Sequence, residues 1–175
     1  MLGDTAVAVH PQDKRYSDLV GKTLILPLVN REIPVIADEY SDPDKGSGAV
    51  KITPGHDFND FEVGRRHNLE IINIFDENAC IVDKKFAKNY IGLDRFEARK
   101  KVIEDLEKEK LIVKIDEVEN VLPYGDRSGV IIEPWLMEQW YVNAKELAKP
   151  TIQAVEEGKM KFIPKNWENL FFEWM

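Results

Sequence analysis

Residues able to do chemistry are concentrated between positions 46 and 64, where the sequence reads GSGAVKITPGHDFNDFEVG. Lys51 offers an ammonium group. Asp57 and Asp60 offer carboxylates three positions apart, the spacing that places two side chains on one turn of a helix. Such a pair of carboxylates can hold a substrate ammonium group or a hydroxyl by charge-assisted hydrogen bonds. Lys51, Asp57 and Asp60 are therefore the candidate catalytic residues.

The first half of this segment has the pattern of a β-strand. Residues 48–53 alternate along the chain, so Lys51 and Thr53 share one face with the small residue Ala49, which leaves room for a ligand beside them. Thr53 therefore joins Lys51 as a candidate substrate-binding residue. Lys51 is equally consistent with the polar side of a half-buried strand, and the sequence pattern alone favours that simpler interpretation.

A Pro-Gly turn and the start of a helix follow. Asp57 is suited to be the N-cap of this helix, with Asp60 at its third position. His56 lies in the turn, so all three are candidate substrate-binding residues. The simpler alternatives are ordinary helix-starting chemistry for Asp57 and Asp60, where a cap stabilises by roughly 0.5 to 2 kcal/mol, and a hydrogen bond of His56 within its own turn.

Two other kinds of site are not expected in this segment. The run GSGAVK lacks the spacing of a nucleotide P-loop, in which four residues separate the first glycine from Gly-Lys-Ser/Thr. His56, Asp57 and Asp60 have no second histidine at ligand spacing, and Cys80 is the single cysteine, so we expect no metal.

The composition indicates one globular body. The chain has 175 residues, of which 43% are hydrophobic and 32% charged, enough for a buried core. A net charge of −8 argues against broad electrostatic binding of nucleic acid. No apolar run approaches the roughly 18 residues of a membrane span, and the first ten residues lack a basic leader. We therefore expect a soluble, cytoplasmic protein.

Short β-type runs separated by Pro, Gly, Asn and Asp dominate the first part of the chain. Two helices stand out from them, one starting near Asp57 and one led by an Asp94 capping box, with Phe96, Val102, Ile103 and Leu106 on one face. The predicted strands are residues 5–9, 22–28, 33–37, 48–53, 71–75 and 111–118. This pattern predicts an α+β fold, mainly β, built as a twisted barrel or sandwich with peripheral helices.

The character of the sequence changes near residue 120. Residues 121–142 read as two extended segments apart from the body, followed by a helix interrupted near Pro150 and by an amphipathic C-terminal pattern. We therefore predict a body at residues 1–120 and a second part at residues 121–175. Aromatic residues gather in that second part, where they favour packing against sequence outside the chain more than base stacking. Two basic clusters, at residues 65–67 and 95–101, favour solvated helix faces.

The segment GSGAVKITPGHDFNDFEVGRRHNL resembles the hallmark of the inserted editing (CP1) domain of class I synthetases for valine, isoleucine and leucine. The runs MLGDTAVAVHPQDKRY, GKTLILPLVNREIPVIADEY, RSGVIIEPWLMEQWYV and KFIPKNWENLFFEWM are similar to the valine enzymes in particular, and together they cover essentially the whole chain. Lys51 strengthens this resemblance, because isoleucine enzymes typically have histidine there.

The resemblance implies a hydrolytic proofreading activity. Threonine and valine are nearly isosteric, so a pocket that binds valine rejects threonine weakly and a second, polar site must remove the error. By this resemblance, Asp60 corresponds to the aspartate that anchors the α-ammonium of the substrate. Lys51 and Asp57 correspond to pocket residues that recognise the threonine hydroxyl and order the site. Hydrolysis is expected to be water-mediated, without a side-chain nucleophile or metal.

The resemblance also implies partners and differences. The partners are the acceptor end of tRNA(Val) carrying threonine and the rest of a synthetase, and a monomer is expected. Editing needs no cofactor, whereas the parent enzyme would use ATP at a site outside this chain, because the HIGH and KMSKS signatures are absent. The family's TRPET strand is also absent. GSG replaces the commoner GTG, and PGHD the frequent PAHD.

Two alternatives stay open at the level of the sequence. The chain could fold yet be catalytically silent, binding the aminoacyl end of tRNA weakly, because TRPET normally contributes an arginine and a threonine to the pocket. It could also be the editing domain of an isoleucine enzyme, although Lys51 and residues 128–142 argue against that.

Overall fold

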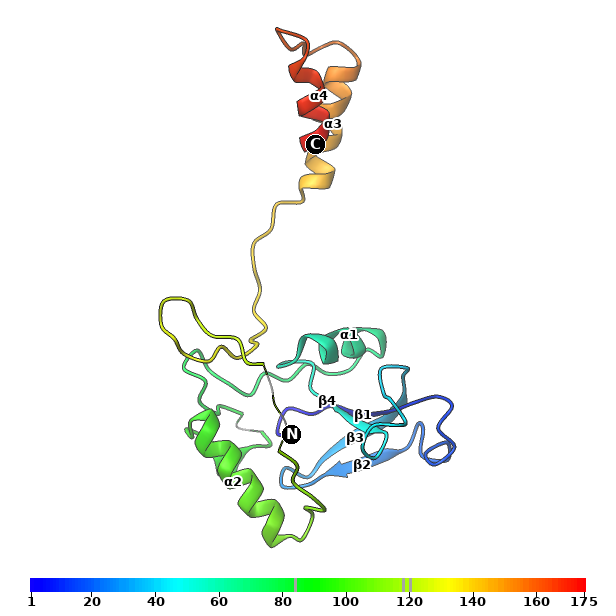
Figure 1. The fold of residues 1–175 in the computed structure, drawn as a ribbon, viewed down its shortest axis with the longest axis vertical. Coiled ribbons are helices and arrows are strands. Elements are labelled where there is room, and N and C mark those ends of the chain that lie inside the picture. The colour runs from blue at the N-terminus through cyan, green and yellow to red at the C-terminus, as the bar shows by residue number, and fades with distance from the viewer. Residues whose placement is uncertain (84, 118, 120) are drawn as a thin grey trace. The chain divides into compact units, whose positions relative to one another are not determined.

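The computed structural model describes every residue except 84, 118 and 120 (Figure 1). Its contacts define two compact units, residues 1–136 and residues 137–175, and each is described by itself. Among the described residues, none of the helices is both long and apolar enough to cross a membrane.

A four-stranded sheet forms the centre of the first unit, in the order β2-β3-β1-β4 (Figure 1). β1 pairs in parallel with β3 and antiparallel with β4, and β2 pairs antiparallel with β3. The strands are β1 (Ala6–Val9), β2 (Thr23–Leu26), β3 (Arg31–Ala37) and β4 (Ala49–Ile52). The first four strands predicted from the sequence are thus confirmed, with small differences at their ends.

The alternation of side chains along β1 divides the core between the two faces of the sheet. Ala6 and Ala8 are fully buried on one face, where they pack with Ile52 and Val63. Val7 faces the opposite way and packs against a larger cluster that includes Leu2 and Ile33. Because Ala6 and Ala8 are small, the helix that carries Val63 lies close against β1 and β4.

Both helices predicted for the first unit are present. α1 (Phe58–Arg66) is capped by Asp57, and α2 (Arg95–Lys108) is capped by Asp94, whose side chain accepts from the Phe96 N–H. A short 3₁₀ helix, η1 (Lys88–Tyr90), precedes α2.

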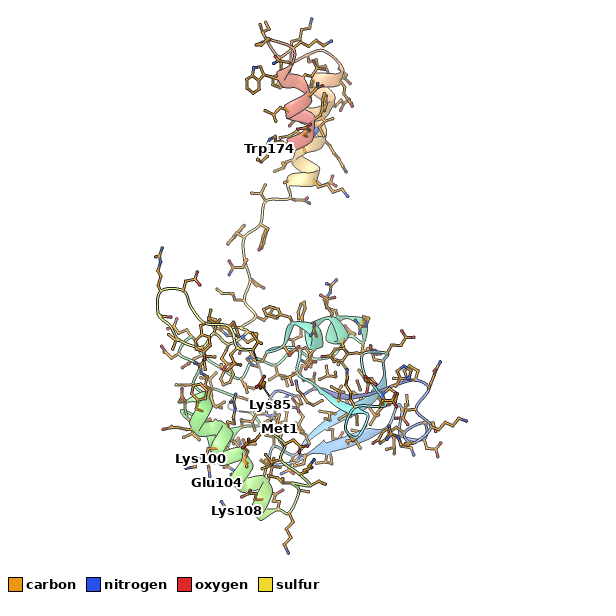
Figure 2. All side chains as sticks on the ribbon, viewed as in Figure 1. Met1, Lys85, Lys100, Glu104, Lys108 and Trp174 are labelled. Carbon is orange, nitrogen blue, oxygen red and sulfur yellow. The ribbon has the colours of Figure 1, made fainter. Side chains whose placement is uncertain are left out.

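The expected face of α2 is only partly buried. Phe96 and Ile103 are exposed, whereas Ala98 is buried and Val102 packs against the larger core cluster. Another face of α2 is charged. Figure 2 shows Lys100, Glu104 and Lys108 following one another along this helix at intervals of one helical turn. All three are exposed, which confirms that this helix has a solvated face of alternating charge.

Two predicted strands are wrong. Residues 71–75 form only an isolated bridge between Phe75 and Ile81, because backbone N–H groups of this segment bind side chains instead of a neighbouring strand. Residues 111–117 are also not a strand, with Val113 and Ile115 exposed, so their alternation has no core to face. Residue 118, the end of the second predicted strand, lies outside the described residues.

The second unit consists of α3 (Ala144–Glu156) and α4 (Trp167–Trp174). The predicted interruption at Pro150 is wrong, because α3 runs through it. Pro150 cannot donate to the carbonyl one turn earlier, and its ring crowds that carbonyl, but the next residue, Thr151, donates through its hydroxyl to the Leu147 carbonyl at 3.2 Å. The rings of Phe162 and Phe171 pack with their centroids 5.2 Å apart and hold α4 to the segment before it.

The α+β class is confirmed. The barrel has only loose support, because the strands form an open sheet over the described residues. The functional boundary predicted at residue 120 stays a prediction. By their contacts, residues 121–136 belong with the first unit, and Glu133 pairs there with Arg95 at 3.3 Å.

Candidate functional site

Asp57 begins the site by capping α1. Its Oδ1 accepts hydrogen bonds from the backbone N–H groups of Asn59, at 2.9 Å, and Asp60, at 3.0 Å. The N-cap prediction is therefore confirmed, and the helix start places Asp60 one turn into α1, facing β4.

Asp60 is a buried carboxylate with a solvent-reaching partner. Its side chain is 2% exposed, and its Oδ2 accepts from Lys51 Nζ at 2.7 Å and from the Thr53 N–H at 2.8 Å. The Lys51 side chain, in contrast, is 53% exposed. Strand β4 and helix α1 thus bring together the lysine and the aspartate that the sequence singled out, as an ion pair with one end in solvent.

Thr53 joins this pair to a buried polar layer under the strand. Its hydroxyl donates to Asp4 Oδ1, and both residues are buried. The Nη2 of Arg31, also buried, donates to the carbonyls of Leu2, at 2.6 Å, and Asp4, at 2.7 Å. Through these bonds the start of the chain and β3 support the turn that holds Asp60.

His56 bonds outside its own turn. Its Nε2 accepts from the Ile74 N–H at 3.0 Å, and its Nδ1 lies 3.0 Å from the Pro134 carbonyl oxygen. A carbonyl only accepts, so Nδ1 carries the proton and the ring is neutral. Burial lowers the pKa of His56, opposed by the bond to Pro134 and the charge of Glu133.

Tyr40 is a neighbour of the site that the sequence did not reveal. It follows β3, and burial raises the pKa of its hydroxyl, with further contributions from the carboxylates of Asp60 and Asp57. Both acids therefore act on the phenol, although Tyr40 is 39% exposed. The only signal in the sequence was a tyrosine in the loop before β4.

The far end of α1 is anchored by a second buried acid, Asp38. It accepts from Arg66 through two nitrogens, from His67 Nε2 at 2.8 Å and from the Tyr40 N–H at 2.9 Å. Burial alone would raise the pKa of Asp38, but these hydrogen bonds outweigh it and lower the pKa to about 2. The basic cluster at residues 65–67 is therefore partly a structural anchor.

A cavity of about 460 Å³ opens beside Asp57, between the start of α1 and residues 132–136. Its walls are mainly apolar and include Phe58, Phe61 and Trp135. Lys51 and Asp60 do not line it. Asp57 links the two features, because it lines the cavity and accepts a hydrogen bond from the backbone N–H of Asp60.

The arrangement offers charge and hydrogen bonding without an activated nucleophile. Within residues 1–83, 85–117, 119 and 121–175, no group of three or more His, Cys, Asp or Glu side chains is placed to hold a metal ion. Lys51 and Asp57 reach solvent, whereas Asp60 offers a buried negative charge that already holds an ammonium group. Such a site can bind a small cationic substrate and orient a water molecule.

Comparison with known proteins identifies the class. The family described as "Leucyl-tRNA synthetase, editing domain" matches residues 8–115, which contain the sheet, except for the first two residues of β1, and both α-helices of the first unit. The chain belongs to this editing-domain family.

Valine–tRNA ligases are among the curated proteins that the chain matches. The chain is 56% identical to that of Mesorhizobium japonicum, 54% to that of Rhodopseudomonas palustris and 56% to that of Caulobacter vibrioides, with 100% of this chain covered in each case. The matches cover 21%, 20% and 19% of those proteins. The chain thus spans about a fifth of the length of the curated relatives it matches.

Proposed function

We propose that this chain is the editing domain of a valine–tRNA ligase and that it hydrolyses threonine from mischarged tRNA(Val) after transfer. The observation that carries the proposal is the buried Asp60 carboxylate holding an ammonium group at 2.7 Å. An aminoacyl ester presents the same group, a primary ammonium, next to its reactive carbonyl. The editing-domain family and the valine–tRNA ligases among the relatives support this assignment.

Binding then exchanges one ammonium for another. Lys51 Nζ occupies Asp60 Oδ2, and the carboxylate is too buried to receive a substrate while Lys51 stays in place. The Lys51 side chain is half exposed and can swing into solvent at little cost, whereas Asp60 and its bond from the Thr53 N–H stay fixed. The substrate ammonium takes the place of Lys51, which becomes available to the rest of the substrate.

Recognition of threonine follows from the groups that remain. Asp57 uses Oδ1 for the helix cap, so its other carboxylate oxygen is directed to the threonine hydroxyl, together with the released Lys51. Valine has a methyl group in that position and would leave these polar groups desolvated and unpaired, at a cost of about 1 to 3 kcal/mol. Thr53, whose N–H binds Asp60, completes the wall of this pocket, and His56 supports it from the turn before Asp57.

The reaction is hydrolysis of an ester by water. Water adds to the threonyl carbonyl, the bond from that carbon to the ribose oxygen breaks, and the proton from water passes to the ribose oxygen. The products are threonine and a tRNA with a free terminal hydroxyl. Orientation of water and ester supplies the rate in this scheme, and no cofactor takes part.

The proposal extends to the whole enzyme. The parent would attach valine to tRNA(Val) with ATP at a catalytic site outside this chain, as a monomer in the cytoplasm. A net charge of −8 leaves most of the affinity for tRNA to the rest of the synthetase. In this proposal residues 1–120 form the editing body, and residues 121–175 form the return segment that leads back to the catalytic domain.

The test is deacylation of threonyl-tRNA(Val) and valyl-tRNA(Val) by the full-length enzyme carrying Asp60→Ala. Loss of threonine release with intact aminoacylation supports the proposal. The matched control is Glu62→Ala, an exposed acid on the same helix that pairs with Arg65 at 3.4 Å, which should leave both reactions unchanged. Unchanged threonine release in Asp60→Ala would show that Asp60 merely supports the helix start.

The same assay separates the two alternatives. Discharge of valyl-tRNA(Ile) in preference to threonyl-tRNA(Val) would assign the domain to an isoleucine enzyme. An isolated chain that binds a threonyl-adenosine analogue without hydrolysing threonyl-tRNA(Val), beside an active full-length enzyme, would be the silent binding module.

A further inference from the structure

We propose that His56 is a positioning residue that fixes the turn before Asp57 and does not touch the substrate. In its neutral form with the proton on Nδ1, it joins this turn to two other segments of the first unit. The inference rests on the proposed function, because it assigns the role of His56 within that site.

Both ring nitrogens of His56 are already engaged by the protein. The Ile74 N–H donates to Nε2 at 3.0 Å, and Nδ1 donates to the Pro134 carbonyl at 3.0 Å. A substrate hydrogen bond to either nitrogen would leave one of these backbone groups without its partner. The edge of the Phe75 ring also packs on the imidazole, with ring centroids 4.8 Å apart.

The turn is closed against its surroundings by two glycines. A Cβ on Gly55 would overlap the Ile72 carbonyl oxygen, so the turn touches the same segment of backbone that the imidazole binds at Ile74. A Cβ on Gly64 would lie 2.8 Å from the ring of Pro54, so α1 is packed equally closely on the other side. The imidazole therefore joins surfaces already in contact and fixes their register.

The consequence reaches the site through one peptide unit. Asp57 directly follows His56, and its Oδ1 sets the start of α1 and hence the place of Asp60. Ile74 is itself buried and its carbonyl accepts from the Val82 N–H at 2.9 Å, so this anchor belongs to the core. Loss of the imidazole therefore loosens the turn, whereas the carboxylate groups of Asp57 and Asp60 are still present.

Three variants of the full-length enzyme separate the two hydrogen bonds. In His56→Gln the side-chain amide oxygen reaches the Nε2 position and can accept from the Ile74 N–H. In His56→Asn the amide nitrogen takes the Nδ1 position and can donate to the Pro134 carbonyl. His56→Ala loses both bonds, and His10→Gln is the control, because the ring of His10 accepts from the N–H of Gln12, two residues away. Hydrogen exchange of the peptide containing Ile74 and kcat for threonyl-tRNA hydrolysis are measured for each.

If His56 is a positioning residue, kcat should fall most in the variants in which the Ile74 N–H loses its protection against hydrogen exchange. Exchange at Ile74 should accelerate about tenfold or more in Asn and Ala but stay near wild type in Gln, and Gln should retain the most kcat. Equal loss of kcat in all three with wild-type exchange would overturn the proposal, as would faster exchange with full kcat. If the wild-type enzyme hydrolyses no threonyl-tRNA, the proposed function fails. Unaltered hydrogen exchange at Ile74 in His56→Ala would separately refute the positioning role of His56.

Discussion

A buried aspartate lies at each end of α1, and the two differ in how they are paired. Asp38, at the C-terminal end, is bound by Arg66 through two nitrogens, by His67 and by a backbone N–H. Asp60, near the N-terminal end, is bound by Lys51 and one backbone N–H. The first is a saturated anchor, whereas the second holds a single lysine that can leave.

This difference separates stability from function along one helix. A planar guanidinium that binds through two hydrogen bonds is replaced only with difficulty, whereas an ammonium on a flexible stem exchanges readily with another ammonium. The firm bond of Asp38 at the C-terminal end of α1 keeps the N-terminal end in place while the partner of Asp60 changes. Substitutions at Asp38, Lys51 and Asp57 test this contrast.

The largest effect is expected on acid stability through Asp38. Its pKa of about 2 lies below the ordinary value of 3.8, so its contribution is fully present above about pH 3.8 and is lost as the pH falls through about 2. That contribution is about 2 kcal/mol. Denaturant unfolding of the wild type and Asp38→Asn should differ most near neutral pH and converge towards pH 2, and a constant difference would contradict the anchor.

Removal of the exchangeable partner should affect substrate binding more than folding. Lys51→Met vacates Asp60, so KM for threonyl-tRNA should fall by about tenfold, one lost competing ion pair, while kcat also falls because Lys51 no longer assists. Arg66→Met is the matched change at the other end and should lower stability with little effect on KM. A rise in KM for Lys51→Met would show that Lys51 contacts the substrate without first leaving Asp60.

The smallest effect separates the two roles of Asp57. Asp57→Ala should lower the free energy of unfolding by about 1 kcal/mol, whereas Asp57→Asn, which keeps a capping oxygen, should cost only a few tenths. If Asp57 also recognises threonine, both variants should lose discrimination between threonyl-tRNA and valyl-tRNA. Full discrimination in Asp57→Asn would leave Asp57 as a helix cap alone.

Local signals made α1, α2 and the first four strands predictable. Asp57 and Asp94 are caps that act within two or three residues, so the sequence contains nearly all of the information that places them. The pairing of Lys51 with Asp60 was also within reach, because it spans only nine positions across a turn.

Distant partners could not be predicted in the same way. His56 binds Ile74 and Pro134, which are 18 and 78 positions away, and Asp38 binds Arg66 28 positions away. The same long-range bonds explain the failed strand at residues 71–75, whose apolar alternation was real but whose Ile74 N–H binds an imidazole. Tyr40 escaped notice because only the fold brings it near Asp60.

The central place of β1 in the sheet has a consequence for how the site forms. Val7 stands opposite both Val35 of β3 and Lys51 of β4, so β4 completes the sheet only by pairing with a strand near the start of the chain. Closing so long a loop is slow and entropically costly before its contacts form. We expect Lys51 and Asp60, near neighbours in sequence, to meet late in folding, after that strand pairing has positioned β4 beside α1.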